Sequence, residues 1–146
     1  MDIICLDIGA AGEIPEHWVN FSNKTNIPLN VFAFDENPSK DKNNKYKNID
    51  INFLPFLLGE KEETRKFYIL KRDTGSSIYK LNENFAKEFH YPEYHSLEKT
   101  IDVKLTTLNK LILEKSILSP HVIKLDTQGS ELDILKGMKS ELSKTI

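Results

Sequence analysis

The stretch that decides the fold is Ile3-Ile-Cys-Leu-Asp-Ile-Gly-Ala-Ala-Gly12. Its first six residues are mostly apolar and β-branched, with Asp7 near the carboxyl end, a pattern typical of a strand buried on both faces. The small residues from Gly9 to Gly12 predict a tight turn that brings the backbone close to a ligand and offers it free N–H groups. Because ligands of open α/β sheets bind outside the carboxyl ends of the strands, we interpret this stretch as a first strand and its nucleotide-type binding loop.

The composition restricts the class of protein. The chain has 146 residues, with 39% hydrophobic and 29% charged residues, which is ordinary for one globular domain. A net charge of -2 and a pI of about 6.1 disfavour a nucleic-acid partner, since such proteins usually carry a basic face. No long apolar run and no basic leader segment occur, so we expect neither a membrane span nor a signal peptide. The single cysteine, Cys5, excludes an intrachain disulfide and fits a cytoplasmic location.

Apolar runs alternate with helical patterns along the rest of the chain. Besides the first strand, we expect strands at Val31–Phe34, Ile51–Leu58, Thr100–Leu105 and Val122–Leu125, and a small antiparallel pair of Lys66–Leu70 with Ser76–Tyr79. Pro55 favours a sheet-edge position for the third strand. From Glu131 to Met138, Leu132, Leu135 and Met138 recur at helical spacing. The alternation predicts one α/β domain over residues 1–146, with a mostly parallel sheet and right-handed crossovers.

The glycine turn distinguishes between kinds of nucleotide. A dinucleotide fold uses G-x-G-x-x-G, whose middle glycine lets the backbone reach the pyrophosphate, but here Ala11 places a Cβ near that point. A nicotinamide dehydrogenase is therefore disfavoured, and no G-x-x-x-x-G-K-[S/T] loop for a nucleoside triphosphate is present. Asp35 follows the second strand, where it can accept hydrogen bonds from ribose hydroxyls. These features favour a nucleoside ligand without phosphates.

Five motifs occur in order along nearly the whole chain. They are Asp7-Ile-Gly-Ala-Ala-Gly12, Ala33-Phe-Asp-Glu-Asn-Pro38, Leu58-Gly59, Gly75-Ser-Ser-Ile-Tyr79 and Ile123-Lys-Leu-Asp-Thr-Gln-Gly-Ser-Glu-Leu-Asp-Ile-Leu-Lys-Gly137. Together they resemble the FkbM-type family of S-adenosylmethionine-dependent methyltransferases. The resemblance implies a Rossmann-like methyltransferase fold, S-adenosylmethionine as cofactor, and O-methylation of a hydroxyl on a sugar or another small-molecule or glycan acceptor.

The resemblance also assigns roles to residues. Asp7, Gly9 and Gly12 would hold the methionine end of the cofactor, Asp35 its ribose, and Leu58 with Gly59 would flank the adenine. The implied cofactor-binding residues are Asp7, Gly9, Ala10, Gly12, Asp35, Glu36, Leu58 and Gly59. The implied catalytic residues are Asp126 and Glu131, which would face the methyl group and the acceptor. Asp126 is the candidate general base, because an alcohol is a poor nucleophile until its proton leaves.

Structural roles compete with these assignments. Asp126 could form a turn or cap the following helix, and Glu131 could be a first-turn acid that complements the helix dipole. Trp18 is more typical of a core residue than of a ligand contact, and Ser77, with its neighbour Ser76, could form hairpin hydrogen bonds instead of lining the methyl site. No spacing of His and Asp residues predicts a metal site.

The methyltransferase sheet normally continues past the helix near Glu131 with three more strands, whereas this sequence stops at Ile146. The expectation is therefore a fold truncated after the fourth parallel strand and its helix, as in a fragment of a longer protein. The strand ending at Asp126 would then be an open edge, which a second copy could cover to form a homodimer. The alternative function is a non-catalytic cofactor- or partner-binding Rossmann-like module.

The ribose assignment is testable. If Asp35 accepts hydrogen bonds from the ribose, Asp35→Ala should weaken S-adenosylmethionine binding by about tenfold or more, because a charge-assisted contact is lost. Titration calorimetry measures the affinity. Asp41→Ala, in the lysine- and asparagine-rich segment that follows, serves as the control and should bind normally. An unchanged affinity for Asp35→Ala would refute the assignment.

Overall fold

A four-stranded parallel sheet, here called sheet A, carries the N-terminal strand in its interior. The computed structural model describes residues 2–10, 16–34, 46–90 and 93–145. Sheet A has the order β3-β2-β1-β7, and all three pairings are parallel. Its strands are β1 (Ile3–Ile8), β2 (Leu29–Phe34), β3 (Ile49–Leu54) and β7 (Val122–Leu125). The predicted α/β fold with a mostly parallel sheet is confirmed.

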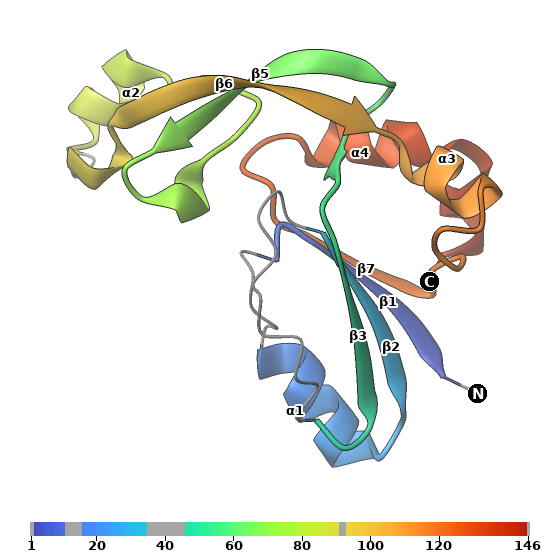
Figure 1. The fold of residues 1–146 in the computed structure, drawn as a ribbon. Coiled ribbons are helices and arrows are strands. Elements are labelled where there is room, and N and C mark those ends of the chain that lie inside the picture. Colours follow the sequence, from blue (N-terminus) through green and yellow to red (C-terminus); the bar gives the residue numbers. More distant parts are fainter. Residues whose placement is uncertain (1, 11–15, 35–45, 91–92, 146) are drawn as a thin grey trace.

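The third predicted strand, Ile51–Leu58, is wrong in its extent. β3 ends at Leu54, and Leu57–Leu58 form a separate strand, β4, in another sheet. Pro55 has no N–H to donate to a ladder, which explains the break between the two strands. β3 nonetheless lies at the edge of sheet A, as Pro55 predicts. Figure 1 shows the chain leaving sheet A here and rising to the second sheet.

The second sheet, here called sheet B, lies beyond the carboxyl ends of the sheet A strands (Figure 1). It has the order β4-β6-β5, with β5 at Glu63–Leu70 antiparallel to β6 at Leu97–Thr106. β6 contains the strand predicted at Thr100–Leu105. The predicted antiparallel pair of Lys66–Leu70 with Ser76–Tyr79 is largely wrong, since a single bridge joins Tyr68 to Ser77. β5 pairs instead along its length with the longer β6, which satisfies more backbone groups.

Helices and 3-10 turns connect the strands. They are α1 (Glu16–Thr25), η1 (Asp73–Gly75), α2 (Glu83–Glu88), η2 (Glu93–His95), α3 (Leu108–Leu113), α4 (Glu131–Met138) and η3 (Lys139–Lys144). The Thr107 side chain caps α3 by accepting a hydrogen bond from the Lys110 N–H at 3.1 Å. No helix in the described ranges is long and apolar enough to cross a membrane.

Strand β1 is buried on both faces, as its sequence predicts. Its even-numbered residues pack on the α3 and α4 side, where Leu6 and Met138 are 0% exposed. Cys5, on the opposite face, packs with Trp18 of α1 and with Val31 of β2. Trp18 is therefore a core residue. Removing this apolar surface from water stabilises the sheet by roughly 25 cal/mol per Å² buried.

Two glycines allow backbone segments to touch. At Gly9, whose φ of +81° suits glycine, an added Cβ would overlap the Asp126 carbonyl. At Gly137 an added Cβ would overlap the Gly59 carbonyl, so α4 lies directly on the turn after β4. This approach orients α4 with Ile134, Gly137 and Met138 buried. Leu132, expected on the apolar face, is 62% exposed instead.

The contact between α4 and Gly59 predicts an unusual substitution result. Alanine normally stabilises a helix relative to glycine by about 1 kcal/mol. Gly137→Ala should instead destabilise the protein by roughly 1–3 kcal/mol, because the new methyl group overlaps backbone that cannot move aside. Urea denaturation measures the change. Leu132→Ala on the same helix is the control and should have a much smaller effect, and a stability of Gly137→Ala equal to or above wild type would contradict the close approach.

Candidate active site

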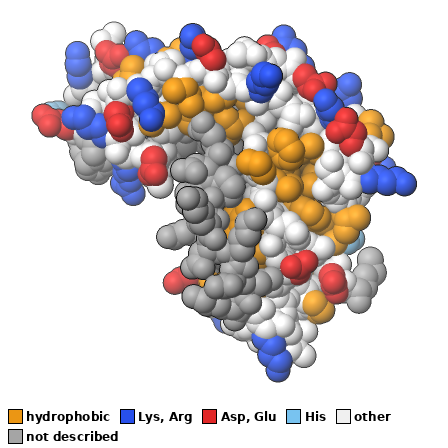
Figure 2. Space-filling view, viewed as in Figure 1, with side chains coloured by type: hydrophobic (Ala, Val, Ile, Leu, Met, Phe, Trp, Pro, Cys, Tyr) orange, Lys and Arg blue, Asp and Glu red, His pale blue; other side chains and the backbone are white. Residues whose placement is uncertain are grey.

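A cavity of about 590 Å³ lies between the carboxyl ends of sheet A and the inner face of sheet B. Sheet A contributes Ile8, Gly9 and Phe34, while Phe67, Ile69 and Ile101 of sheet B form an apolar wall. The loop from Asp126 to Ser130 supplies polar groups. In Figure 2, hydrophobic side chains gather where the two halves of the molecule meet, and charged side chains spread along the outer rim. The cavity volume is within the range of roughly 300–1,000 Å³ typical of small-molecule sites.

The structure brings some of the predicted site residues together at this cavity. Gly9, Leu58 and Asp126 line it. Four other predicted residues do not line the cavity, although each is next to a lining residue in the sequence: Asp7, Ala10, Gly59 and Glu131. Gly12, Asp35 and Glu36, also predicted to bind the cofactor, lie outside the described residues.

Asp7 is fully buried, and its carboxylate is engaged within the protein. Its Oδ2 accepts a hydrogen bond from the indole Nε1–H of Trp18 at 2.7 Å. Its Oδ1 lies 3.0 Å from Nζ of Lys124, an ionic contact without the angle of a hydrogen bond. A buried carboxylate needs such partners, because taking a charge out of water is costly. The cofactor-binding role of Asp7 stays a prediction, and these contacts show that the side chain holds α1 and β7 against β1.

Asp126 follows β7 directly and presents its carboxylate at the cavity. Its side chain is 59% exposed, and its backbone N–H donates to the Ile8 carbonyl at 3.0 Å. The Gln128 amide nitrogen donates to Oδ1 at 3.3 Å, and Lys124 Nζ lies 3.9 Å from Oδ2. The N-cap position of α4 is held by Ser130, so Asp126 does not cap that helix. The carboxylate is thus available to a ligand.

The carboxylate of Glu131 is turned into the preceding loop. Its Oε1 accepts hydrogen bonds from the Thr127 N–H at 2.9 Å, the Thr127 hydroxyl at 3.2 Å and the Gly129 N–H at 3.2 Å. Partial burial raises the pKa of Glu131, but hydrogen bonds from backbone N–H groups and the Thr127 hydroxyl outweigh burial and lower the pKa below its usual value. These contacts fit the role of a first-turn acid, and the catalytic role of Glu131 stays a prediction.

Residues of the Gly75–Tyr79 motif attach sheet B to the loop after β7. The Ser77 hydroxyl donates to the Gln128 carbonyl at 2.9 Å and accepts from the Tyr79 N–H at 3.0 Å. The Tyr79 hydroxyl donates to Asp133 of α4 at 2.6 Å. Ser77 therefore holds Gln128, whose φ is +57°, in the left-handed region. Ser76 lines the cavity, and its hydroxyl accepts from the Leu70 N–H at 3.1 Å.

Sequence reasoning missed Lys124 and the apolar wall of sheet B. Lys124 is directly opposite Asp7 in the β1–β7 register, so the two side chains share a face. Lys124 is the one charged residue in Val122–Leu125, but only the register with β1 shows that it meets Asp7. The wall residues Phe67 and Ile69 occupy alternate positions along β5, so they share one face of that strand.

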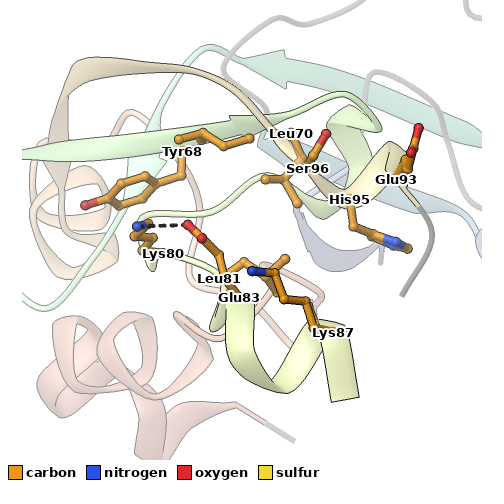
Figure 3. A pocket seen from close by; sticks show the side chains of 11 residues that line it. Tyr68, Leu70, Lys80, Leu81, Glu83, Lys87, Glu93, His95 and Ser96 are labelled. Atoms are coloured by element: carbon orange, nitrogen blue, oxygen red, sulfur yellow. Dashed lines mark ion pairs between the residues drawn. The ribbon is translucent and has the colours of Figure 1, made fainter. Parts of the chain in front are cut away.

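A second cavity, of about 430 Å³, lies on the other side of β5 (Figure 3). Tyr68 and Leu70 face it, whereas their neighbours Phe67 and Ile69 face the larger cavity. The Lys80–Glu83 ion pair, at 3.0 Å, lies at its margin. None of the predicted site residues that the structure describes line this cavity. The larger cavity is therefore the candidate active site.

The hydrogen bonds to Glu131 predict a pH dependence of stability. A carboxylate whose pKa is lowered on folding stabilises the folded state above its unfolded pKa of about 4.3. That contribution is lost as the pH falls through the lower folded pKa. Glu131→Gln should therefore be less stable than wild type at pH 7, and the difference should shrink below about pH 4. Denaturation at several pH values measures this, with Glu88→Gln on exposed α2 as the control; a difference that is constant with pH would contradict the assignment.

In the described part of the chain, no group of three or more His, Cys, Asp and Glu residues is arranged to hold a metal ion. No curated protein and no solved structure matches the sequence. The family model described as "Methyltransferase FkbM domain" matches residues 7–146, a range that runs from Asp7 through the loop after β7 to the last residue. The chain belongs to the FkbM methyltransferase family.

Proposed function

We propose that this protein is an S-adenosylmethionine-dependent O-methyltransferase that acts on a hydroxyl of a sugar or another small-molecule or glycan acceptor. The observation that carries the proposal is the Asp126 carboxylate, which is exposed at a cavity of about 590 Å³ beside the carboxyl ends of β1 and β7. Membership of the FkbM family supports the methyltransferase chemistry.

The residues at the sheet A end of the cavity fit S-adenosylmethionine. Ile8 and Gly9 line the cavity at the end of β1, the position we assign to the polar methionine end. Phe34, Leu57 and Leu58 offer apolar surface that suits the adenine ring. When bound, the cofactor supplies an electrophilic methyl group attached to a sulfonium. Placement at the carboxyl ends of parallel strands agrees with the general position of ligands in open α/β sheets.

Asp126 would act as the general base toward the acceptor. Gln128 donates to its Oδ1, which fixes the carboxylate while leaving acceptor capacity on both oxygens. The carboxylate can therefore take the proton of a hydroxyl as that oxygen becomes nucleophilic. The apolar wall of Phe67 and Ile69 would limit water around the reacting groups.

The mixed lining of the cavity supports a hydroxylated acceptor. Besides Asp126, the polar residues Asp73, Thr74 and Ser76 line the cavity. Carboxylates and hydroxyls accept hydrogen bonds from alcohol groups, while the apolar side chain of Ile101 can cover the apolar face of a ring. A sugar presents both kinds of surface.

The proposal includes a cytoplasmic location. Its support is that the sole cysteine, Cys5, is a buried free thiol. Burial, followed by the neighbouring Asp7 carboxylate, raises the pKa of this thiol to about 11, so it stays protonated at neutral pH.

The proposed function is tested on the chain itself. Calorimetry with S-adenosylmethionine should show binding, and incubation with a panel of hydroxylated sugars and glycans should yield S-adenosylhomocysteine. Binding without product from any acceptor would favour a non-catalytic cofactor-binding module. Binding of NADH instead would overturn the cofactor assignment.

The role of Asp126 gives a separate prediction. Asp126→Asn keeps the shape of the side chain but removes the base, so turnover should fall about 100-fold or more while cofactor affinity changes little. Steady-state kinetics and calorimetry on the same preparation separate the two effects. The control is Asp102→Asn on β6, an exposed carboxylate paired with Lys66 at 2.9 Å and outside the cavity. Normal turnover in Asp126→Asn would remove it as the base.

A further inference from the structure

Lys124 lies where three parts of the candidate site meet. It is on β7, at the edge of sheet A, and its register partner on β1 is Asp7. Its Nζ lies 3.0 Å from Asp7 Oδ1, donates to the Gly9 carbonyl at 3.2 Å, and lies 3.9 Å from Asp126 Oδ2. Its side chain is 23% exposed and does not line the cavity.

The three contacts join loops that come from opposite ends of the chain. Gly9 begins the turn after β1, and Asp126 begins the loop after β7. Their backbones already touch, since the Asp126 N–H donates to the Ile8 carbonyl and no Cβ fits at Gly9. A single ammonium that contacts both loops and the buried Asp7 fixes their relative position more firmly than the backbone contact alone.

We propose that Lys124 is a positioning residue of the methyltransferase site. It holds the Gly9 carbonyl and the Asp126 carboxylate in register, so that the cofactor turn and the proposed base form one preorganised unit. The expected effect on cofactor binding and turnover rests on the proposed function. The expected effect on the two loops rests only on the contacts that Lys124 makes.

A purely stabilising role is the competing explanation. Asp7 is 0% exposed, and removing the only cation beside it among the described residues would leave a buried charge unpaired. Lys124→Met by itself would then lose stability whichever explanation holds. The informative comparison is Asp7→Asn against Asp7→Asn/Lys124→Met, because neither variant contains the buried carboxylate.

The first measurement needs no cofactor. Hydrogen exchange is followed at three backbone N–H groups: those of Gly9 and Ala10, which donate to the Phe34 carbonyl, and that of Asp126. At equal global stability, these groups should exchange about tenfold faster in the double variant than in Asp7→Asn. The amide of Tyr68 in sheet B, bonded to the Ser77 carbonyl at 2.8 Å, is the internal control and should exchange equally in both.

The second measurement uses S-adenosylmethionine as the probe. The double variant should bind it about tenfold more weakly than Asp7→Asn and turn over more slowly at saturating cofactor. Equal exchange, equal affinity and equal turnover in the two variants would overturn the inference and assign Lys124 to stability. If the exchange difference is found but the wild-type chain does not bind S-adenosylmethionine, the positioning role stands and the proposed function fails.

Discussion

The structure depends on a carboxylate that water cannot reach. Asp7 lies in the central part of sheet A with no exposed surface, and its two oxygens meet the Trp18 indole and the Lys124 ammonium. Removing one partner from a buried pair typically lowers the free energy of unfolding by about 3–5 kcal/mol. This loss is similar to that caused by truncating a large core side chain. Because Trp18 is on α1 and Lys124 is on β7, one side chain fixes a helix and a strand against β1.

Backbone contacts through glycine set the rest of the site. Gly9 lets the first loop touch Asp126, and Gly137 lets α4 touch the turn at Gly59. Both contacts bring segments distant in sequence closer than any side chain would allow. Sheet B is then attached to this frame through Ser77 and Tyr79, whose hydroxyls donate to Gln128 and Asp133. The glycines and serines of the sequence motifs therefore have structural reasons that are independent of any ligand.

The sequence predicts sheet A well and sheet B poorly. Strands β1 and β2 are mostly apolar and mostly buried, which local pattern alone identifies. β7 is a short, half-buried apolar run interrupted by Lys124, and Asp126 follows as the residue after it. The pairing of β5 with β6 is non-local, and the short Ser76–Tyr79 segment offers a closer but poorer partner. Similarly, the apolar pattern of α4 does not show whether Leu132 or Ile134 is buried. The contact of Gly137 with Gly59 sets the rotation of the helix and buries Ile134. Lys124 can be identified as the partner of Asp7 only from the register between β1 and β7, which cannot be read from the spacing of residues along the sequence.

The alternation along β5 has a consequence for how specificity can change. Phe67 and Ile69 face the candidate active site while Tyr68 and Leu70 face the second cavity, and the register already shifts between Ile69 and Leu70. A slip of one residue against β6 would exchange the two sets of side chains. An insertion or deletion in the turn between β5 and Ser76 could thus replace the side chains that face the candidate active site in one step. Sheet A, with Asp7 and its partners, would be left intact, so the two walls of the cavity can change separately in evolution.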